Sequence, residues 1–341
     1  MLNRTEQNRT EQNRTYASVD LCKFFMAIVV VAIHVHPFEG YAESTWIDIY
    51  RLMCYCAVPF FFLCTGYFLA KGIDCAEAVS ALEQTKSYLN KTLKLYIIWT
   101  IVYIPLALLL YFTNTTPWWK DFIFYLHGLV IMGEHYNSWI LWYLLSAVYG
   151  LAYLYVCVKY KFSLNRIVLI GFSLYLVGAL ITSFAQYHGE LPNILHWLQR
   201  VLGYCVSGRI FTSFFFIPMG MLIYRHCWSK WQGVLLIVLA LLLWLLGAKN
   251  GIALKNIVIA ISSVGLFLLV INVHLSAKPF YRQLRVSSTV VYFIHLWVWT
   301  VVYGIVYQQK TYGMDMFLLT LGISLVISGG YICYRTVRNT G

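Results

Sequence analysis

Ten apolar runs, several of them shorter than a simple membrane span, constrain the fold of this chain more than any other feature of its sequence. A transmembrane helix needs about 20 predominantly apolar residues, and such runs are too numerous here for soluble domains. Charged residues make up only 11% of the chain, whereas soluble domains carry about 25%. The sequence therefore predicts an all-α polytopic membrane protein with about ten transmembrane helices. The expected spans are 21–37, 52–70, 93–112, 139–158, 167–184, 210–224, 233–247, 256–275, 288–307 and 316–334.

The distribution of lysine and arginine predicts how these spans are oriented. With the N-terminus placed in the cytoplasm, 18 of the 25 basic residues fall on the inner side and 7 on the outer side. Loops rich in positive charge stay in the cytoplasm, so both termini are expected to be cytoplasmic. The net charge of +12 is spread over these inner loops, and no nucleic-acid partner is expected.

The two ends of the chain are polar. Residues 3–15 repeat Asn-Arg-Thr-Glu-Gln twice and then Asn-Arg-Thr, without any apolar period. Such a segment cannot bury enough apolar surface to fold, so we expect a disordered cytoplasmic tail over 1–19. The membrane domain is expected over 20–336, followed by a short cytoplasmic tail over 337–341.

Lys23 and His34 lie eleven residues apart within the first apolar run. Eleven steps of about 100° end roughly 20° from three full turns, so both side chains share one helix face. Ionisable residues inside a membrane are costly and commonly functional. An imidazole suits proton abstraction from a hydroxyl, and Lys23 suits contact with an anion. The alternatives are a histidine that bonds a neighbouring helix and a lysine that reaches the membrane surface.

Other polar residues in or beside the spans are also candidates for function. His295 lies in the middle of a span, and Tyr292 precedes it by three residues on nearly the same helix face. Arg209, on the outer side, either meets an anionic acceptor or marks a helix end. A basic cluster before the third span either binds phosphate or fixes the topology. Its members are Lys86, Lys91 and Lys94.

No metal site is expected from the cysteines and histidines. Cys54 and Cys56 form a Cys-x-Cys pair without a second pair of ligands. His34 and His36 would point about 200° apart on a helix. The nine cysteines are instead expected to act as small apolar residues.

Four segments, in the same order along the chain, resemble the acyltransferase-3 family of ten-helix membrane proteins. Asp20-x-x-Lys23, followed after ten residues by His34, is similar to the Asp-x-x-Arg and His of the family's first helix. The other three segments are 58–67, 138–144 and 292–295. The resemblance therefore rests on motifs spread over most of the chain.

The resemblance implies transfer of an acyl group, expected to be acetyl, from cytoplasmic acyl-CoA to a hydroxyl group. The implied acceptor is an extracytoplasmic or lipid-linked glycan, or a small hydroxyl-bearing molecule, and the implied location is a bacterial plasma membrane, among its lipids. His34 is then the essential imidazole, and Lys23, His295 and Tyr292 complete the catalytic set. Lys23 with Lys86, Lys91 and Lys94 is implied to bind the CoA phosphates. The implied substrate-binding residues on the outer side are Arg209, Trp139 and Trp142.

Residues 93–108 resemble one branch in particular, the membrane module of vancomycin-resistance serine racemases. In that branch the module is associated with serine supply, and a soluble pyridoxal-phosphate domain follows it. Such a C-terminal soluble domain, missing from this chain, is a candidate partner. The alternative to an acyltransferase is therefore a transport module for a small amino acid such as serine, since intramembrane histidines suit either role.

Overall fold

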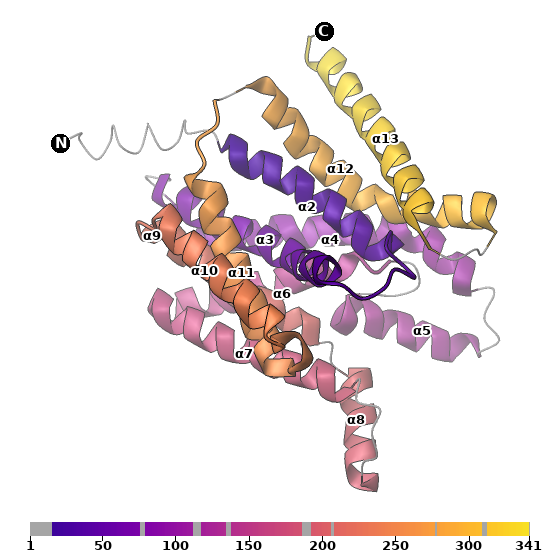
Figure 1. The fold of residues 1–341 in the computed structure, drawn as a ribbon, viewed down its shortest axis with the longest axis horizontal. Coiled ribbons are helices and arrows are strands. Elements are labelled where there is room, and N and C mark those ends of the chain that lie inside the picture. The colour runs from indigo at the N-terminus through magenta and orange to yellow at the C-terminus, as the bar shows by residue number, and fades with distance from the viewer. Residues whose placement is uncertain are drawn as a thin grey trace. The chain divides into compact units, whose positions relative to one another are not determined.

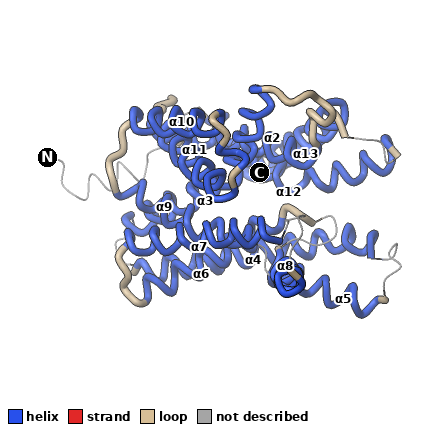
Figure 2. Tube along the Cα trace, turned by 60° about the horizontal axis from the view of Figure 1, so that its bottom comes forward, coloured by secondary structure: helices blue, strands red, loops and turns tan. Residues whose placement is uncertain are grey.

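The structure is a computed structural model, and it describes residues 16–75, 79–111, 117–133, 138–185, 192–205, 208–276, 278–308 and 312–340. Every regular element in these ranges is a helix (Figure 2). This confirms the all-α fold class. The repeat at 3–15 lies outside the described residues. At the two predicted tails, α2 begins at Ala17 and α13 continues to Thr340.

Eight of the described helices are long and apolar enough to cross a membrane. They are α2 (Ala17–Val35), α3 (Thr45–Cys75), α4 (Ala81–Tyr111), α6 (Leu141–Lys159), α7 (Leu164–Ala185), α11 (Ile252–Asn272), α12 (Pro279–Val302) and α13 (Met314–Thr340). The other two predicted spans correspond to α9 (Thr212–Arg225) and α10 (Lys230–Leu245), which are shorter. The chain is thus a polytopic membrane protein, and the orientation of its spans stays a prediction.

The remaining described elements are short. α5 (Trp118–His127) continues into a π-helix, η1 (Gly128–Met132), and α8 covers Asn193–Cys205. Two 3₁₀ turns, η2 (Gly208–Phe211) and η3 (Ala248–Asn250), precede α9 and α11. A second π-helix, η4 (Tyr303–Tyr307), extends α12.

Local sequence signals explain where several helices begin and end. Ser80 and Glu83 exchange side-chain and backbone hydrogen bonds at 3.0–3.2 Å before α4, which is a capping box. α12 begins with Pro279 in its first turn, where the missing N–H costs no bond. α2 ends where His36 adopts the left-handed conformation, with φ of 49°, and donates its N–H to the carbonyl oxygen of Ala32 at 3.0 Å.

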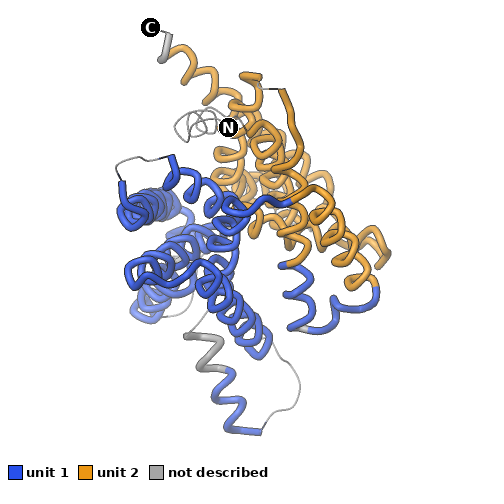
Figure 3. The backbone as a smooth tube through the Cα atoms, turned by 90° about the vertical axis from the view of Figure 1, so that its left-hand side faces the viewer, with its two compact units in different colours: residues 1–12, 62–228, 246–260 blue, residues 13–61, 229–245, 261–341 orange. Residues whose placement is uncertain are grey.

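The chain divides into two compact units, which are described separately below (Figure 3). Unit 1 contains residues 62–228 and 246–260. Unit 2 contains residues 13–61, 229–245 and 261–341. Helix α3 contributes its first part to unit 2 and its last part to unit 1.

Unit 1 is held together by helices whose backbones touch at glycines. A Cβ added to Gly66 on α3 would collide with the carbonyl oxygen of Ile217, and one added to Gly220 on α9 would collide with that of Leu63. Gly150 on α6 likewise faces Ser213 of α9. Small residues let membrane helices approach closely, which increases their van der Waals contact. The sequence therefore brings α3, α6 and α9 together through these positions.

Unit 2 is built around the packing of α2 on α12, which lie side by side (Figure 1). The buried face of α2 is rich in valine, and Val29, Val30 and Val31 are at most 3% exposed. α12 also packs on α13, where the Ser328 hydroxyl donates to that of Ser287 at 2.8 Å in a buried contact. α12 is therefore the central helix of this group.

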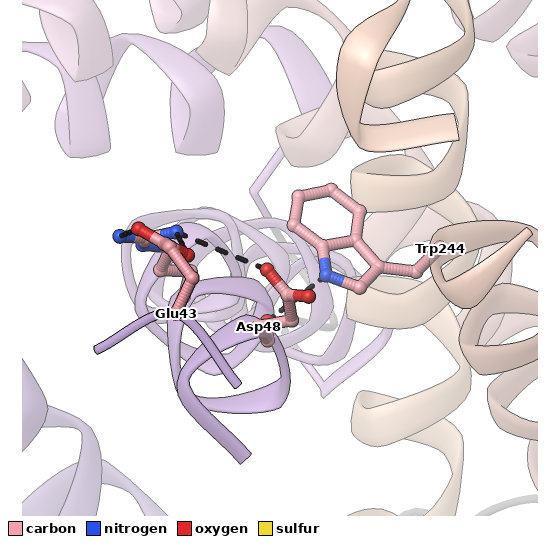
Figure 4. A network of polar contacts seen from close by, with 4 residues as sticks. Glu43, Asp48 and Trp244 are labelled. Carbon is pink, nitrogen blue, oxygen red and sulfur yellow. Dashed lines mark hydrogen bonds and ion pairs between the residues drawn. The ribbon is translucent and has the colours of Figure 1, made fainter. Parts of the chain in front are cut away.

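A polar network joins α10 to the beginning of α3 within unit 2 (Figure 4). The buried Trp244 indole donates to the backbone carbonyl of Asp48 at 2.9 Å. Arg51 makes two 2.6 Å contacts with the Glu43 carboxylate and lies 3.8 Å from the Asp48 carboxylate. The Trp244 hydrogen bond therefore holds the C-terminal end of the short helix α10 against the start of α3.

Candidate functional site

The imidazole rings of His34 and His295 stack on each other at the interface of α2 and α12. Their centroids are 5.3 Å apart and their planes are inclined by 30°. His295 is completely buried, whereas His34 is partly exposed. The two histidines that the sequence suggested separately therefore form one pair.

The hydrogen bonding of His295 defines which of its nitrogens can act as a base. Nδ1 lies 3.1 Å from the carbonyl oxygen of Val291, one turn earlier on the same helix. A carbonyl oxygen only accepts, so Nδ1 carries the hydrogen, and in the neutral ring Nε2 carries the lone pair. Nε2 is buried and has no hydrogen-bond partner among the residues that the structure describes. It is therefore available to accept a proton.

Tyr292 completes this group of polar rings. Its ring centroid lies 6.2 Å from that of His295, and the two rings are inclined by 67°. It also meets Phe61 of α3 edge to face, with centroids 6.0 Å apart. The predicted catalytic residues His34, His295 and Tyr292 are thus brought together by α2 and α12.

The fourth predicted catalytic residue, Lys23, lies towards the other end of α2. Because α2 is one uninterrupted helix, Lys23 and His34 share a face as their spacing requires. Asp20, one turn before Lys23, interacts with both Lys23 and Arg285 of α12. The Arg285 Nε lies 3.9 Å from the Asp20 carboxylate. The α2–α12 pair thus carries a charged cluster at one end and an imidazole pair nearer the other.

The other predicted donor-binding residues belong to unit 1. Lys86, Lys91 and Lys94 all lie on α4 and are exposed. Lys91 lies 5.9 Å above the ring of Tyr88, one turn earlier. The convergence of these lysines with Lys23 stays a prediction, because Lys23 lies in unit 2.

Two of the three predicted outer-side residues meet within unit 1. The Arg209 guanidinium lies 5.9 Å from the ring centroid of Trp142, a cation–π distance. Ser146 of α6 donates to the carbonyl oxygen of Ile210 at 2.8 Å, which fixes η2 against α6. Trp139 lies in the turn just before α6 and is exposed. Arg209 and Trp142 therefore form one positive and aromatic surface.

An aromatic stack at the C-terminal end of α12 is absent from the sequence predictions. Trp299, Tyr303 and Tyr312 have ring centroids 5.2–6.3 Å apart, with planes inclined by at most 21°. His36 packs edge-on against Tyr312, with centroids 5.4 Å apart. Burial and the nearby Tyr303 and Glu39 raise the pKa of Tyr312, so its hydroxyl keeps its proton at neutral pH. Trp299 follows His295 by one turn, and this spacing was a visible signal.

Arg285 was also missed as a site residue, although the sequence contains a signal for it. It precedes His295 by ten residues, much as Lys23 precedes His34 by eleven.

In the described ranges, no group of three or more His, Cys, Asp or Glu side chains is placed to hold a metal ion.

Comparison with known proteins gives relatives for part of the chain. An amino-acid racemase of Enterococcus faecalis is 30% identical over 217 residues, which are 61% of this chain and 29% of that protein. A second amino-acid racemase of E. faecalis is 26% identical over 211 residues, 60% of this chain and 28% of that protein. A serine/alanine racemase of Enterococcus gallinarum is 26% identical over 160 residues, 47% of this chain and 22% of that protein.

These matches span less than a third of the length of each relative. No solved structure matches the chain. The profile of the acyltransferase domain family, in contrast, matches residues 16–335. The match includes every described helix at least in part and contains the histidine pair, and this multi-pass membrane protein therefore belongs to the acyltransferase domain family.

Proposed function

We propose that this protein moves an acyl group from cytoplasmic acyl-CoA to a hydroxyl group of an extracytoplasmic or lipid-linked acceptor. Acetyl is the acyl group that we propose first. The location is the plasma membrane of a bacterium. The single observation that carries the proposal is the stacking of His34 on His295, with Nε2 of His295 buried and aimed at no described partner.

Acyl transfer to a hydroxyl needs a base that removes the hydroxyl proton as the oxygen attacks. In the proposed reaction, His34 accepts this proton and the acceptor oxygen bonds to the thioester carbonyl carbon. The tetrahedral intermediate then expels the CoA thiolate, which takes the proton back from His34. The products are an ester and free CoA, so no oxidant, reductant or metal ion is consumed.

His295 and Tyr292 have supporting roles in this proposal. The buried His295 ring holds the His34 ring in place by stacking on it. Its Nε2 lone pair and the Tyr292 hydroxyl add polar groups to an otherwise apolar environment, where they interact strongly with a developing charge. The partly exposed His34 is the ring that meets the acceptor.

The donor would bind through its phosphates, which are anionic. Lys23 is the cation on the same helix face as His34, about 16 Å away along the axis. Lys86, Lys91 and Lys94 supply further exposed positive charge on α4. On the outer side, Arg209 and Trp142, together with Trp139, would contact a glycan or other hydroxyl-bearing acceptor.

The proposal is tested by measuring CoA release from acetyl-CoA by the purified full chain in proteoliposomes, with membrane lipids and acceptor glycan supplied. His34→Ala should abolish acetyl-CoA turnover. His274→Ala is the matched control, because His274 is exposed in the loop between α11 and α12. Turnover that survives in His34→Ala would contradict the assignment of the base.

A second candidate function comes from the relatives, which are named as racemases of amino acids, one of them of serine and alanine. In this alternative, the chain is the membrane module of a racemase-type protein and takes up serine. Proteoliposomes containing the protein would then accumulate labelled serine without any requirement for CoA. Serine uptake that is lost in His34→Ala, with no acetyl-CoA turnover in wild type, would favour this alternative.

A further inference from the structure

We infer that Arg285, together with Lys23, binds the pyrophosphate group of the donor at the charged end of the α2–α12 pair, with Asp20 as the counter-ion when the site is empty. The inference extends the proposed function, which requires an anionic donor but names no residue on α12 for it. It concerns unit 2 alone.

Each of the two helices carries a cation ten or eleven residues before its histidine. On α2, Lys23 precedes His34 by eleven residues, and on α12, Arg285 precedes His295 by ten. The histidines stack, and Arg285 reaches Asp20 near the start of α2. Two contacts at different heights show that the helices run parallel, so both cations lie at the same end, roughly 15 Å from the histidines.

The contact with Asp20 does not use all the hydrogen-bond donors of the Arg285 guanidinium. Nε of Arg285 is 3.9 Å from the carboxylate, which is longer than a hydrogen bond of about 2.7–3.2 Å. The Arg285 side chain is 52% exposed, whereas that of Asp20 is only 14% exposed. An arginine has five N–H donors in a planar fork that matches phosphate oxygens. Arg285 can therefore meet a second anion while it stays near Asp20.

The balance of charge at this end favours an anionic ligand. Asp20 interacts with Arg285 and with Lys23, so one carboxylate faces two cations. Arg282 lies one turn before Arg285 and is also exposed, but the contact with Asp20 is made by Arg285. Asp20 alone does not balance the charges of Lys23 and Arg285. A pyrophosphate group, which acyl-CoA carries, would supply the negative charge that balances them.

The position of Arg285 on α12 connects this site to the imidazole pair. Tyr292 follows Arg285 by seven residues, which is about 20° short of two full turns, so the two share a face. Tyr292 in turn packs against His295. A donor whose phosphates are held by Arg285 and Lys23 would extend along this face towards the histidines with its acyl end.

The test is binding of inorganic pyrophosphate to the purified full chain, followed by thermal unfolding at constant ionic strength. Pyrophosphate should raise the unfolding temperature of the wild type. Arg285→Gln and Lys23→Gln should each weaken the apparent affinity roughly tenfold. Arg282→Gln is the matched control, and its affinity should stay near that of the wild type. Equal affinity of Arg285→Gln and wild type, or an equal loss in Arg282→Gln, would overturn the inference.

Asp20→Asn separates a binding role from a merely structural ion pair. If Asp20 is the resting counter-ion, its neutralisation should tighten pyrophosphate binding, because the competing carboxylate is gone. A structural pair predicts instead that Asp20→Asn and Arg285→Gln lower stability alike and leave the affinity unchanged. Should Arg285→Gln fail to fold, Arg285→Lys keeps the charge but not the planar fork, and it should show an intermediate affinity. Wild-type affinity in Arg285→Lys would overturn the role of the fork.

The same samples distinguish this inference from the proposed function. If pyrophosphate binds through Arg285 but neither CoA nor acetyl-CoA binds, the acyl-CoA donor is wrong and the anion site stands. If acetyl-CoA is turned over and Arg285→Gln has the wild-type KM, the anion site is wrong and the acyltransferase stands.

Discussion

His34 and His295 come from opposite ends of the chain, and their rings stack with centroids 5.3 Å apart between α2 and α12. The contact depends on the close packing of two parallel helices, one of which presents a valine-rich buried face. It places a partly exposed imidazole against a completely buried one. The surroundings of the His34 ring therefore depend on the position of a helix that is distant in the sequence.

The hydrogen bond between Trp244 and the Asp48 carbonyl predicts a specific loss of stability. Trp244→Phe keeps most of the apolar contact but removes the buried hydrogen bond from the indole to the Asp48 carbonyl, which should cost about 1 kcal/mol. Trp231→Phe on the same helix should cost less, because Trp231 is 69% exposed. Unfolding of both variants in detergent, followed by tryptophan fluorescence and circular dichroism, measures the difference; equal losses would contradict this account of α10.

The glycine contacts between α3 and α9 predict sensitivity to a single methyl group. Gly66→Ala or Gly220→Ala would push the two helix backbones apart, and each should cost about 1–3 kcal/mol. Gly322→Ala is the control, since a Cβ at this position on α13 meets nothing within 4 Å. Alanine favours helix over glycine, so this control should not lose stability. Thermal unfolding of the three variants decides between close packing and general intolerance of substitution.

The predicted ten-span topology can be tested at the two shorter helices. If α9 and α10 both cross the membrane, the loop before α10 is cytoplasmic and the loop after it is outside. Ser229→Cys and Asn250→Cys, each in a cysteine-free background, place exposed thiols in these two loops. A membrane-impermeant thiol reagent should label Asn250→Cys in intact cells and Ser229→Cys only after permeabilisation. Labelling of both from the same side would show that α10 does not cross.

The sequence alone predicted the fold class and the shared helix face of Lys23 and His34 for clear physical reasons. Each apolar run is long enough to predict a helix by itself, and the spacing of Lys23 and His34 depends only on helix geometry. The short lengths of α9 and α10 were also visible in the sequence, because the predicted spans 210–224 and 233–247 are themselves shorter than about 20 residues. The exact ends of the helices were not predicted, because hydropathy averages over a window.

The pairing of residues from different helices could not be predicted in the same way. The stacking of His34 on His295 and the contact of Arg285 with Asp20 depend on which helices pack together, and hydropathy carries no such information. A cation ten or eleven residues before the histidine on each helix was a visible signal for Arg285. Whether Lys86, Lys91 and Lys94 join Lys23 stays a prediction, as does the role of Arg209, Trp139 and Trp142.

The most direct measurement of the central claim is a double-mutant cycle on acetyl transfer in proteoliposomes. His34→Ala, His295→Ala and the double variant are compared with wild type, and His274→Ala serves as the control. Groups that act as a unit give non-additive losses, so the three variants should lose similar amounts of kcat/KM while His274→Ala keeps its activity. Full activity in His295→Ala, or losses that multiply in the double variant, would contradict a joint role for the two imidazoles.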